Sequence, residues 1–230
     1  MKKNKKGSHV GVVLSFTIFV VFLIFLFSAL QPALKTERDK TSTLTYIKDK
    51  VIEMSSDNLT IKNIKYTVSS ALQVDCIEIS DDSGEKALVK RDGSIVPYSK
   101  TGEVVTIYNL IIGDNFFKVY YSNSIDEQVK SGSCSNPGVV EEAAFVDKRN
   151  IIFISKFTEL SEKDYDLLKQ TFGIGEESDF EFTLLDAEKN PITSEKEVDI
   201  KTNVYVDNFP ILYSDNKGEL KSGFINIKVW

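Results

Sequence analysis

A long uninterrupted run of apolar residues lies near the start of the chain. From Val10 to Leu30 the run has no charged residue, and its few polar members are serine and threonine, whose hydroxyls can bond back to their own helix. At about 1.5 Å of rise per residue, a helix of this length covers roughly 30 Å, the thickness of the hydrocarbon core of a bilayer. We therefore predict a transmembrane helix over residues 10–31. Pro32 lacks an N–H, so we expect it to kink or end this helix.

A second helical pattern follows within the segment 32–56, which we interpret as a linker and an amphipathic helix. Apolar residues recur there at steps of three and four positions, namely Leu44, Ile47, Val51 and Met54. Such a stripe is typical of a helix that packs one face on a protein core. Packing on a sheet of the domain is the favoured reading. The alternative is a helix lying on the membrane surface, but its polar face is not enriched in cations alone.

Beyond this segment the pattern changes to short alternating runs rich in valine, isoleucine, tyrosine and phenylalanine, which predict strands. The predicted strands are 59–68, 72–79, 87–90, 94–98, 104–112, 116–121, 139–146, 151–157, 180–185, 198–206 and 224–230. Asp92-Gly93 predicts a tight hairpin turn. A loop rich in serine and glycine around Cys134 suggests a division into a first β-rich subdomain, 57–132, and a second, 133–230.

One helix is predicted inside the second subdomain, over residues 162–172. Ser161 is its expected N-cap, an apolar stripe includes Leu168 and Phe172, and Gly173 is its expected end. The fold class predicted from these patterns is α+β. It consists of an N-terminal transmembrane helix and a mainly antiparallel, β-rich extracytoplasmic domain with one or two short helices.

Charge sets the expected orientation. Lys2, Lys3, Lys5 and Lys6 form an uncompensated basic cluster before the apolar run, so residues 1–9 are predicted to be a cytoplasmic leader, with the C-terminal domain extracellular. A cleaved secretory signal is the competing reading. All 34 acidic residues and 24 of the 28 basic residues follow the run, which gives that part a formal charge of −10. This balance argues against nucleic acid or anionic lipid as a partner.

The sequence offers little catalytic chemistry. His9, at the membrane edge, is the single histidine, so a histidine-based triad or metal site outside the membrane is not expected. The carboxylate pairs Asp81-Asp82, Glu141-Glu142 and Glu176-Glu177 follow no calcium-loop pattern and are interpreted as solvated loop charge. No phosphate-binding glycine motif is present. We therefore predict a non-enzymatic protein without a cofactor or metal.

Two covalent modifications are suggested. Cys76 and Cys134 are the only cysteines, and an even, sparse count outside the cytoplasm favours one disulfide over two separate thiols. Asn58-Leu59-Thr60 matches the N-glycosylation acceptor pattern, at a place where we expect a loop between helix and strand.

The junction Lys5-Lys6-Gly7-Ser8, directly before the apolar run, resembles the class III signal of archaeal type IV pilin-like proteins. The resemblance covers residues 1–30 and, more loosely, the order of a long N-terminal helix and a β-rich domain. It implies that a prepilin peptidase cleaves after Gly7, and that the apolar helix first anchors the subunit and later packs against copies of itself or other pilin-like subunits.

Two further hypotheses stay open. An anchored binding or adhesion domain that does not polymerise is favoured by Val12, which stands where many pilins have glutamate, and by Pro32. An enzyme of unknown type is the least favoured reading, because it rests only on a domain large enough to hold a pocket.

Overall fold

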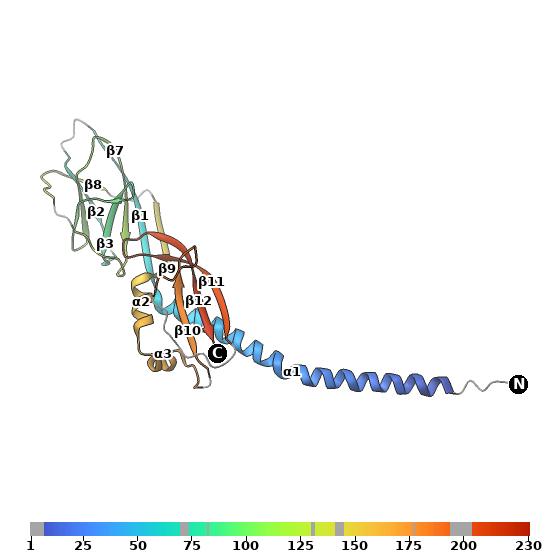
Figure 1. The fold of residues 1–230 in the computed structure, drawn as a ribbon. Helices are drawn as coiled ribbons and strands as arrows, with labels where there is room; N and C mark the ends of the chain where they lie inside the picture. Colours follow the sequence, from blue (N-terminus) through green and yellow to red (C-terminus); the bar gives the residue numbers. More distant parts are fainter. Residues whose placement is uncertain are drawn as a thin grey trace.

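The structure is a computed structural model in which a long helix projects from a β-rich body (Figure 1). It describes residues 7–69, 74–81, 83–129, 132–140, 145–176, 178–193 and 204–230, and only the backbone of residues 7–9 and 31–39. The helices are α1 (Gly7–Ser55), α2 (Ile154–Glu162) and α3 (Tyr165–Phe172). The strands are β1 (Ser56–Val68), β2 (Cys76–Ser80), β3 (Ala87–Arg91), β4 (Ser94–Ile95), β5 (Tyr98–Thr101), β6 (Val104–Tyr108), β7 (Gly113–Tyr121), β8 (Pro137–Val140), β9 (Phe145–Phe153), β10 (Phe180–Leu185), β11 (Tyr205–Ser214) and β12 (Leu220–Val229).

Helix α1 is continuous through Pro32, so of the two outcomes expected for the proline, a kink or an end, the helix end does not occur. Its 49 residues run through the proline without a break in helical backbone. A proline inside a helix removes one hydrogen bond and crowds the carbonyl four residues earlier, which costs roughly 3 kcal/mol but need not end the helix when the flanking turns are stable. The flanking turns are an apolar run on one side and a packed amphipathic stripe on the other. The ribbon changes direction along its length, between the projecting part and the part that meets the body (Figure 1).

The predicted amphipathic stripe packs on the body. Leu44, Ile47 and Val51 are buried, and Met54 packs beside them against α2 and the sheet. At the end of the helix, the hydroxyl of Ser55 donates to the carbonyl of Val51 at 2.6 Å. Strand β1 starts at the next residue, so α1 enters the sheet without a connecting loop.

The strands form two sheets. One has eight strands in the order β10-β12-β11-β9-β1-β7-β3-β4, and the other has four in the order β5-β6-β2-β8. All pairings are antiparallel except β9 with β11 and β2 with β8. The fold is therefore α+β with mainly antiparallel sheets, as predicted. The C-terminal strand β12 lies between β10 and β11, and Trp230 is buried.

Two hydrophobic cores share the eight-stranded sheet. The first joins β1, β3 and β7 to the four-stranded sheet, and the second joins α1, α2 and α3 to β10 and β12. Strand β9 contributes to both, because Ile151 and Phe153 belong to the first core and Ile152 to the second. Since successive side chains of a strand point to opposite faces, the two cores cover opposite faces of the sheet at β9.

The division at residues 132 and 133 does not separate two bodies. Strand β8 lies beyond that boundary but pairs with β2, with Cys76 opposite Pro137. In the other direction, the turn between β11 and β12 reaches the first part, where the backbone N–H of Asp126 donates to the carbonyl of Asn216 at 2.8 Å. The long strand pair β1–β9 then links the two cores into one unit.

Helix α3 lies where the helix 162–172 was predicted, but the predicted cap was wrong, and a second helix, α2, replaces the end of the strand predicted over residues 151–157. Ser161 lies inside α2, and the N-cap of α3 is Asp164, whose carboxylate accepts from the backbone N–H of Leu167 at 3.1 Å. An aspartate is as good an N-cap as a serine, and Lys163 already has extended backbone. The predicted end is correct, because Gly173 adopts the left-handed conformation with φ 66°.

Candidate functional site

The projecting part of α1 carries a continuous run of exposed apolar side chains. Val10–Leu30 has a mean hydropathy of 3.0, and none of its most apolar stretch is buried. Phe16 and Phe25 expose 66% and 67% of their surface. The core helix of a soluble protein is excluded by this exposure, because such a helix buries its apolar side chains. By length and composition, the segment fits a membrane anchor or a signal sequence.

The threonine within this segment is satisfied inside the helix. The hydroxyl of Thr17 donates to the carbonyl of Val13, four residues earlier, at 2.9 Å. In hydrocarbon an unsatisfied hydroxyl costs free energy, so this back-bond makes the threonine compatible with a lipid surrounding.

The junction between α1 and the body is a packed contact. Ile47 and Val51 are fully buried in the second core, against α2, β11 and β12. Lys40 donates to the hydroxyl of Ser178 at 3.1 Å, which adds a polar contact one turn before the stripe. Because β1 continues directly from α1 and pairs on both sides, the orientation of the helix is tied to the centre of the sheet.

The predicted processing site lies at the edge of what the structure describes. Lys5 and Lys6 are outside the described residues, and Gly7 and Ser8 form the first residues of α1. Cleavage after Gly7 stays a prediction.

The two cysteines come together. Cys76 at the start of β2 and Cys134 before β8 are joined as a disulfide, with their Cα atoms 5.5 Å apart. Next to them, the carboxylate of Asp75 accepts the backbone N–H groups of Ser135 and Asn136 at 2.9 and 3.0 Å. These backbone donors lower the pKa of Asp75 and hold it as an anion. The carboxylate of Asp75 therefore fixes the loop that leads into β8.

Among the described residues, Asp75, Cys76 and Cys134 are also the single group with metal-ligand spacing. A metal needs thiolates, which the disulfide removes, and both oxygens of Asp75 already accept backbone hydrogen bonds. The arrangement fits a structural role better than a metal site.

Asn58 lies in a strand, not in the loop that the sequence suggested. It is the third residue of β1, its side chain is exposed, and it pairs with Asn150 of β9. The loop is missing because the helix passes directly into the strand. Glycosylation at this position is an untested prediction.

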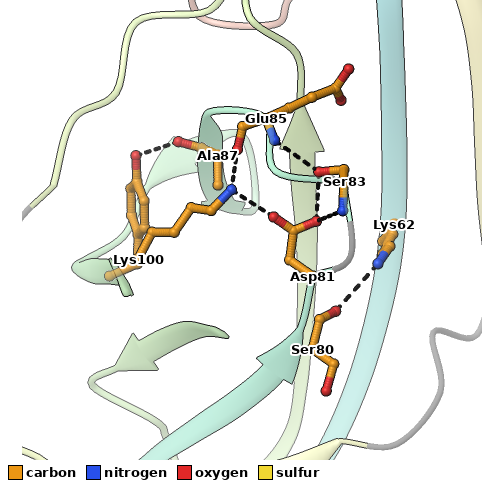
Figure 2. Close-up of polar contacts among 8 residues, drawn as sticks. Lys62, Ser80, Asp81, Ser83, Glu85, Ala87 and Lys100 are labelled. Atoms are coloured by element: carbon orange, nitrogen blue, oxygen red, sulfur yellow. Dashed lines mark hydrogen bonds and ion pairs between the residues drawn. The ribbon is translucent and has the colours of Figure 1, made fainter. Parts of the chain in front are cut away.

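A buried ion pair joins two strands of the four-stranded sheet, as Figure 2 shows. The ammonium group of Lys100 on β5 lies 2.6 Å from Asp81, which follows β2, and it also donates to the backbone carbonyl of Glu85. The other oxygen of Asp81 accepts from the backbone N–H and the hydroxyl of Ser83 at 3.1 and 2.6 Å. Lys62 of β1 donates to the carbonyl of Ser80 beside this group.

The electrostatics of this group favour a fixed ion pair over proton transfer. Burial alone raises the pKa of Asp81, but the hydrogen bonds from Lys100 and Ser83 outweigh it and hold the pKa below its ordinary value. Burial raises the pKa of Glu85, and the negative charges of Asp57 and Asp81 raise it further. Burial also raises the pKa of Tyr98 to about 12, so its hydroxyl remains protonated and donates to the carbonyl of Ala87 at 2.6 Å.

The interpretation of Asp81 as solvated loop charge was therefore wrong, because its side chain is fully buried. Sequence reasoning missed it because the lysine that pairs with it comes from a different hairpin, 19 positions later. Of the other carboxylate pairs, Glu141 and Glu142 lie outside the described residues, and so does Glu177, whereas Glu176 is exposed.

Comparison of the chain with protein-family models, curated proteins and solved structures finds no match.

Proposed function

We propose that this protein is a non-enzymatic, single-pass membrane-anchored surface protein, a pilin-like filament or envelope component. The apolar part of α1 would span the cell membrane with the N-terminus in the cytoplasm, and the β-rich body would face the outside. The observation that carries the proposal is the continuity of α1, in which an exposed apolar segment and a buried amphipathic segment belong to one helix.

The continuity of α1 favours a rigid connection between the apolar segment and the β-rich body. A flexible tether would isolate the body from its anchor, whereas a helix packed on the sheet fixes the body relative to the anchor. In a filament, neighbouring apolar helices can replace lipid around α1 while the bodies stay outside. The continuous helix removes one argument against this reading, because Pro32 does not end α1.

The experiment that tests the proposal is the mass of the mature N-terminus, measured on membranes and on material sheared from the cell surface. A chain starting at Ser8 and found in the sheared fraction is the result expected for a pilin-like subunit. A chain starting at Met1 and confined to membranes would support the alternative, an anchored binding or adhesion domain that does not polymerise. A chain starting beyond Gln31 would overturn the anchor itself.

The alternative is favoured by a different observation. The body carries a cavity of about 540 Å³ on the sheet face formed by β1, β3 and β7. A filament subunit does not require such a cavity, whereas a binding domain does.

A further inference from the structure

Three lysines gather on one face of the eight-stranded sheet. Lys90 on β3 lies directly opposite Lys118 on β7, and Lys65 on β1 lies opposite Phe116 on β7. Directly paired residues share a face, and residues two positions apart on a strand share it too. Phe116, Lys118 and Tyr120 therefore form a row on β7, with Lys65 on one side and Lys90 on the other.

The charges in this row are only partly compensated. Lys90 exposes 5% of its surface, and its ammonium group is 3.7 Å from Glu219, a carboxylate half exposed on the turn before β12. Lys65 pairs with Asp114 at 2.9 Å. Lys118 is exposed and has no ion-pair partner among the described residues. Like charges directly opposite each other in a sheet repel, so the facing pair Lys90 and Lys118 costs stability unless an anion lies between them.

The same residues line the cavity of about 540 Å³, which is within the usual range for small-molecule sites. Its walls combine these cations with aromatic rings. The ammonium group of Lys65 is 5.5 Å from the ring centre of Phe116, and that of Lys90 is 5.4 Å from the ring centre of Tyr120. Asp92 is the one acidic residue in the lining, at the hairpin turn between β3 and β4.

We propose that this cavity binds an anionic saccharide. A carboxylate or sulfate group would accept hydrogen bonds from Lys118 and Lys90, and the apolar face of a sugar ring would lie on Phe116 or Tyr120. Two aromatic side chains four positions apart on a strand are separated by roughly 13 Å, which matches a short oligosaccharide better than a small inorganic anion. Charge-assisted hydrogen bonds supply the attraction, and the aromatic surfaces select for a ligand with an apolar face.

The site stands out against its surroundings. The part of the chain after the apolar run has a formal charge of −10, yet three lysines line the cavity. Asp114 and Glu219 offset the charges of Lys65 and Lys90, so Lys118 carries the charge that remains available to a ligand. An exposed lysine without an ion-pair partner among the described residues, set in an acidic domain, attracts an anion at this one place instead of binding polyanions along the whole surface. The biological relevance of an envelope saccharide rests on the proposed function, because such ligands meet the body only if it lies outside the membrane. The binding test below does not require that location.

The test uses the full chain in a neutral detergent and measures binding of trigalacturonate by isothermal titration calorimetry. Maltotriose is the neutral probe, and inorganic phosphate is the competitor without a sugar ring. We expect trigalacturonate to bind, maltotriose to bind at least tenfold more weakly, and added sodium chloride to weaken the trigalacturonate complex. Lys118→Gln should weaken binding at least fivefold, because it removes an exposed cation that has no ion-pair partner among the residues the structure describes. Lys50→Gln, on α1 and outside the cavity lining, is the matched control and should leave binding unchanged.

Phe116→Ala separates saccharide recognition from simple anion binding, and we expect it to weaken trigalacturonate but not phosphate. Equal binding of maltotriose, displacement by phosphate at equal concentration, or unchanged binding by Lys118→Gln would each overturn the proposal. Preference for an acidic peptide such as tetraglutamate would overturn the assignment to saccharides. None of these binding results depends on the mature N-terminus. A negative binding result would therefore overturn the saccharide site without overturning the proposed membrane anchor.

Discussion

The ammonium group of Lys100 lies 2.6 Å from the fully buried carboxylate of Asp81. This contact joins β5 to the end of β2, inside the four-stranded sheet, and turns one oxygen of Asp81 toward Ser83. A buried ion pair of this kind positions strands and does not carry chemistry, because every donor around it stabilises the charged carboxylate.

Removing one partner of this pair should destabilise the body. Asp81→Ala leaves the ammonium group of Lys100 nearly buried without its counter-charge, which costs about 3 kcal/mol of unfolding free energy. Urea unfolding followed by tryptophan fluorescence measures the change, since Trp230 is the single tryptophan. Glu53→Ala removes an exposed ion pair with Lys50 and serves as the control that leaves the midpoint unchanged. Equal midpoints for the two variants would contradict a structural role for Asp81.

The pH dependence of stability should report the same carboxylate. The folded state lowers the pKa of Asp81, so its contribution is complete above its ordinary pKa of about 4 and disappears as the pH falls through the lowered value. The difference in stability between wild type and Asp81→Asn should therefore shrink toward zero as the pH is lowered from 5 to about 2.

The contribution of Glu85 to stability has the opposite pH dependence, because the folded state raises the pKa of this carboxyl group. Glu85→Gln should stabilise the protein at pH 7 and have no effect below about pH 4. Thermal unfolding across this pH range measures both.

Two isoleucines of the same helix should respond differently. Ile47→Ala removes a fully buried side chain from the second core and should cost about 2–5 kcal/mol. Ile18→Ala changes a side chain that is 61% exposed, so the stability of the body should not change. Unfolding of the detergent-solubilised full chain compares them. A loss of body stability in Ile18→Ala would contradict the separation of α1 into projecting and packed parts.

Gly223 of β12 allows a close approach between strands. A Cβ atom there would collide with the backbone carbonyl of Leu185 and lie 2.8 Å from the ring of Tyr213. Backbone cannot move aside as a side chain can, so Gly223→Ala should cost about 1–3 kcal/mol. Gly175→Ala has open space around its Cβ and is the matched control, for which no loss is expected. Circular dichroism during heating measures both.

The disulfide should matter for stability. It closes a loop of 58 residues, for which the chain-entropy model gives about 4 kcal/mol. Cys76→Ala with Cys134→Ala should lower the urea midpoint, and a reductant should lower the midpoint of the wild type but not of the double variant. Non-reducing peptide mapping checks the bond itself. Free thiols in protein isolated from the cell envelope would contradict this prediction.

Much of the local structure follows from the sequence because it depends on neighbouring residues. The exposed apolar helix and its amphipathic continuation are visible as two hydrophobic patterns. Asp92 and Gly93 both adopt positive φ in the predicted hairpin turn, and Gly173 ends α3 as expected. Each depends on the conformational preferences of a few consecutive residues, which the order of the residues records.

The N-cap of α3 is not determined by the local sequence alone. Ser161 and Asp164 are both suitable N-caps, and the choice between them depended on α2, which buries Phe157 and Leu160 in the second core. The pattern of residues 151–157 is apolar enough for a strand, yet its second half is helical because it packs beside α1. Local propensity leaves two solutions here, and long-range packing selects one.

The sequence by itself determined the apolar run, the acidic composition of the part that follows it, many of the alternating strands and the restriction of histidine to His9. The tertiary structure alone decided that α1 continues through Pro32, that β8 crosses the expected boundary, and that Asp81 is buried against Lys100. It also decided that Lys65, Lys90 and Lys118 share one face. These features bring together residues that lie far apart along the chain, and their proximity follows from strand order and register, which are set by the burial of two cores on one sheet.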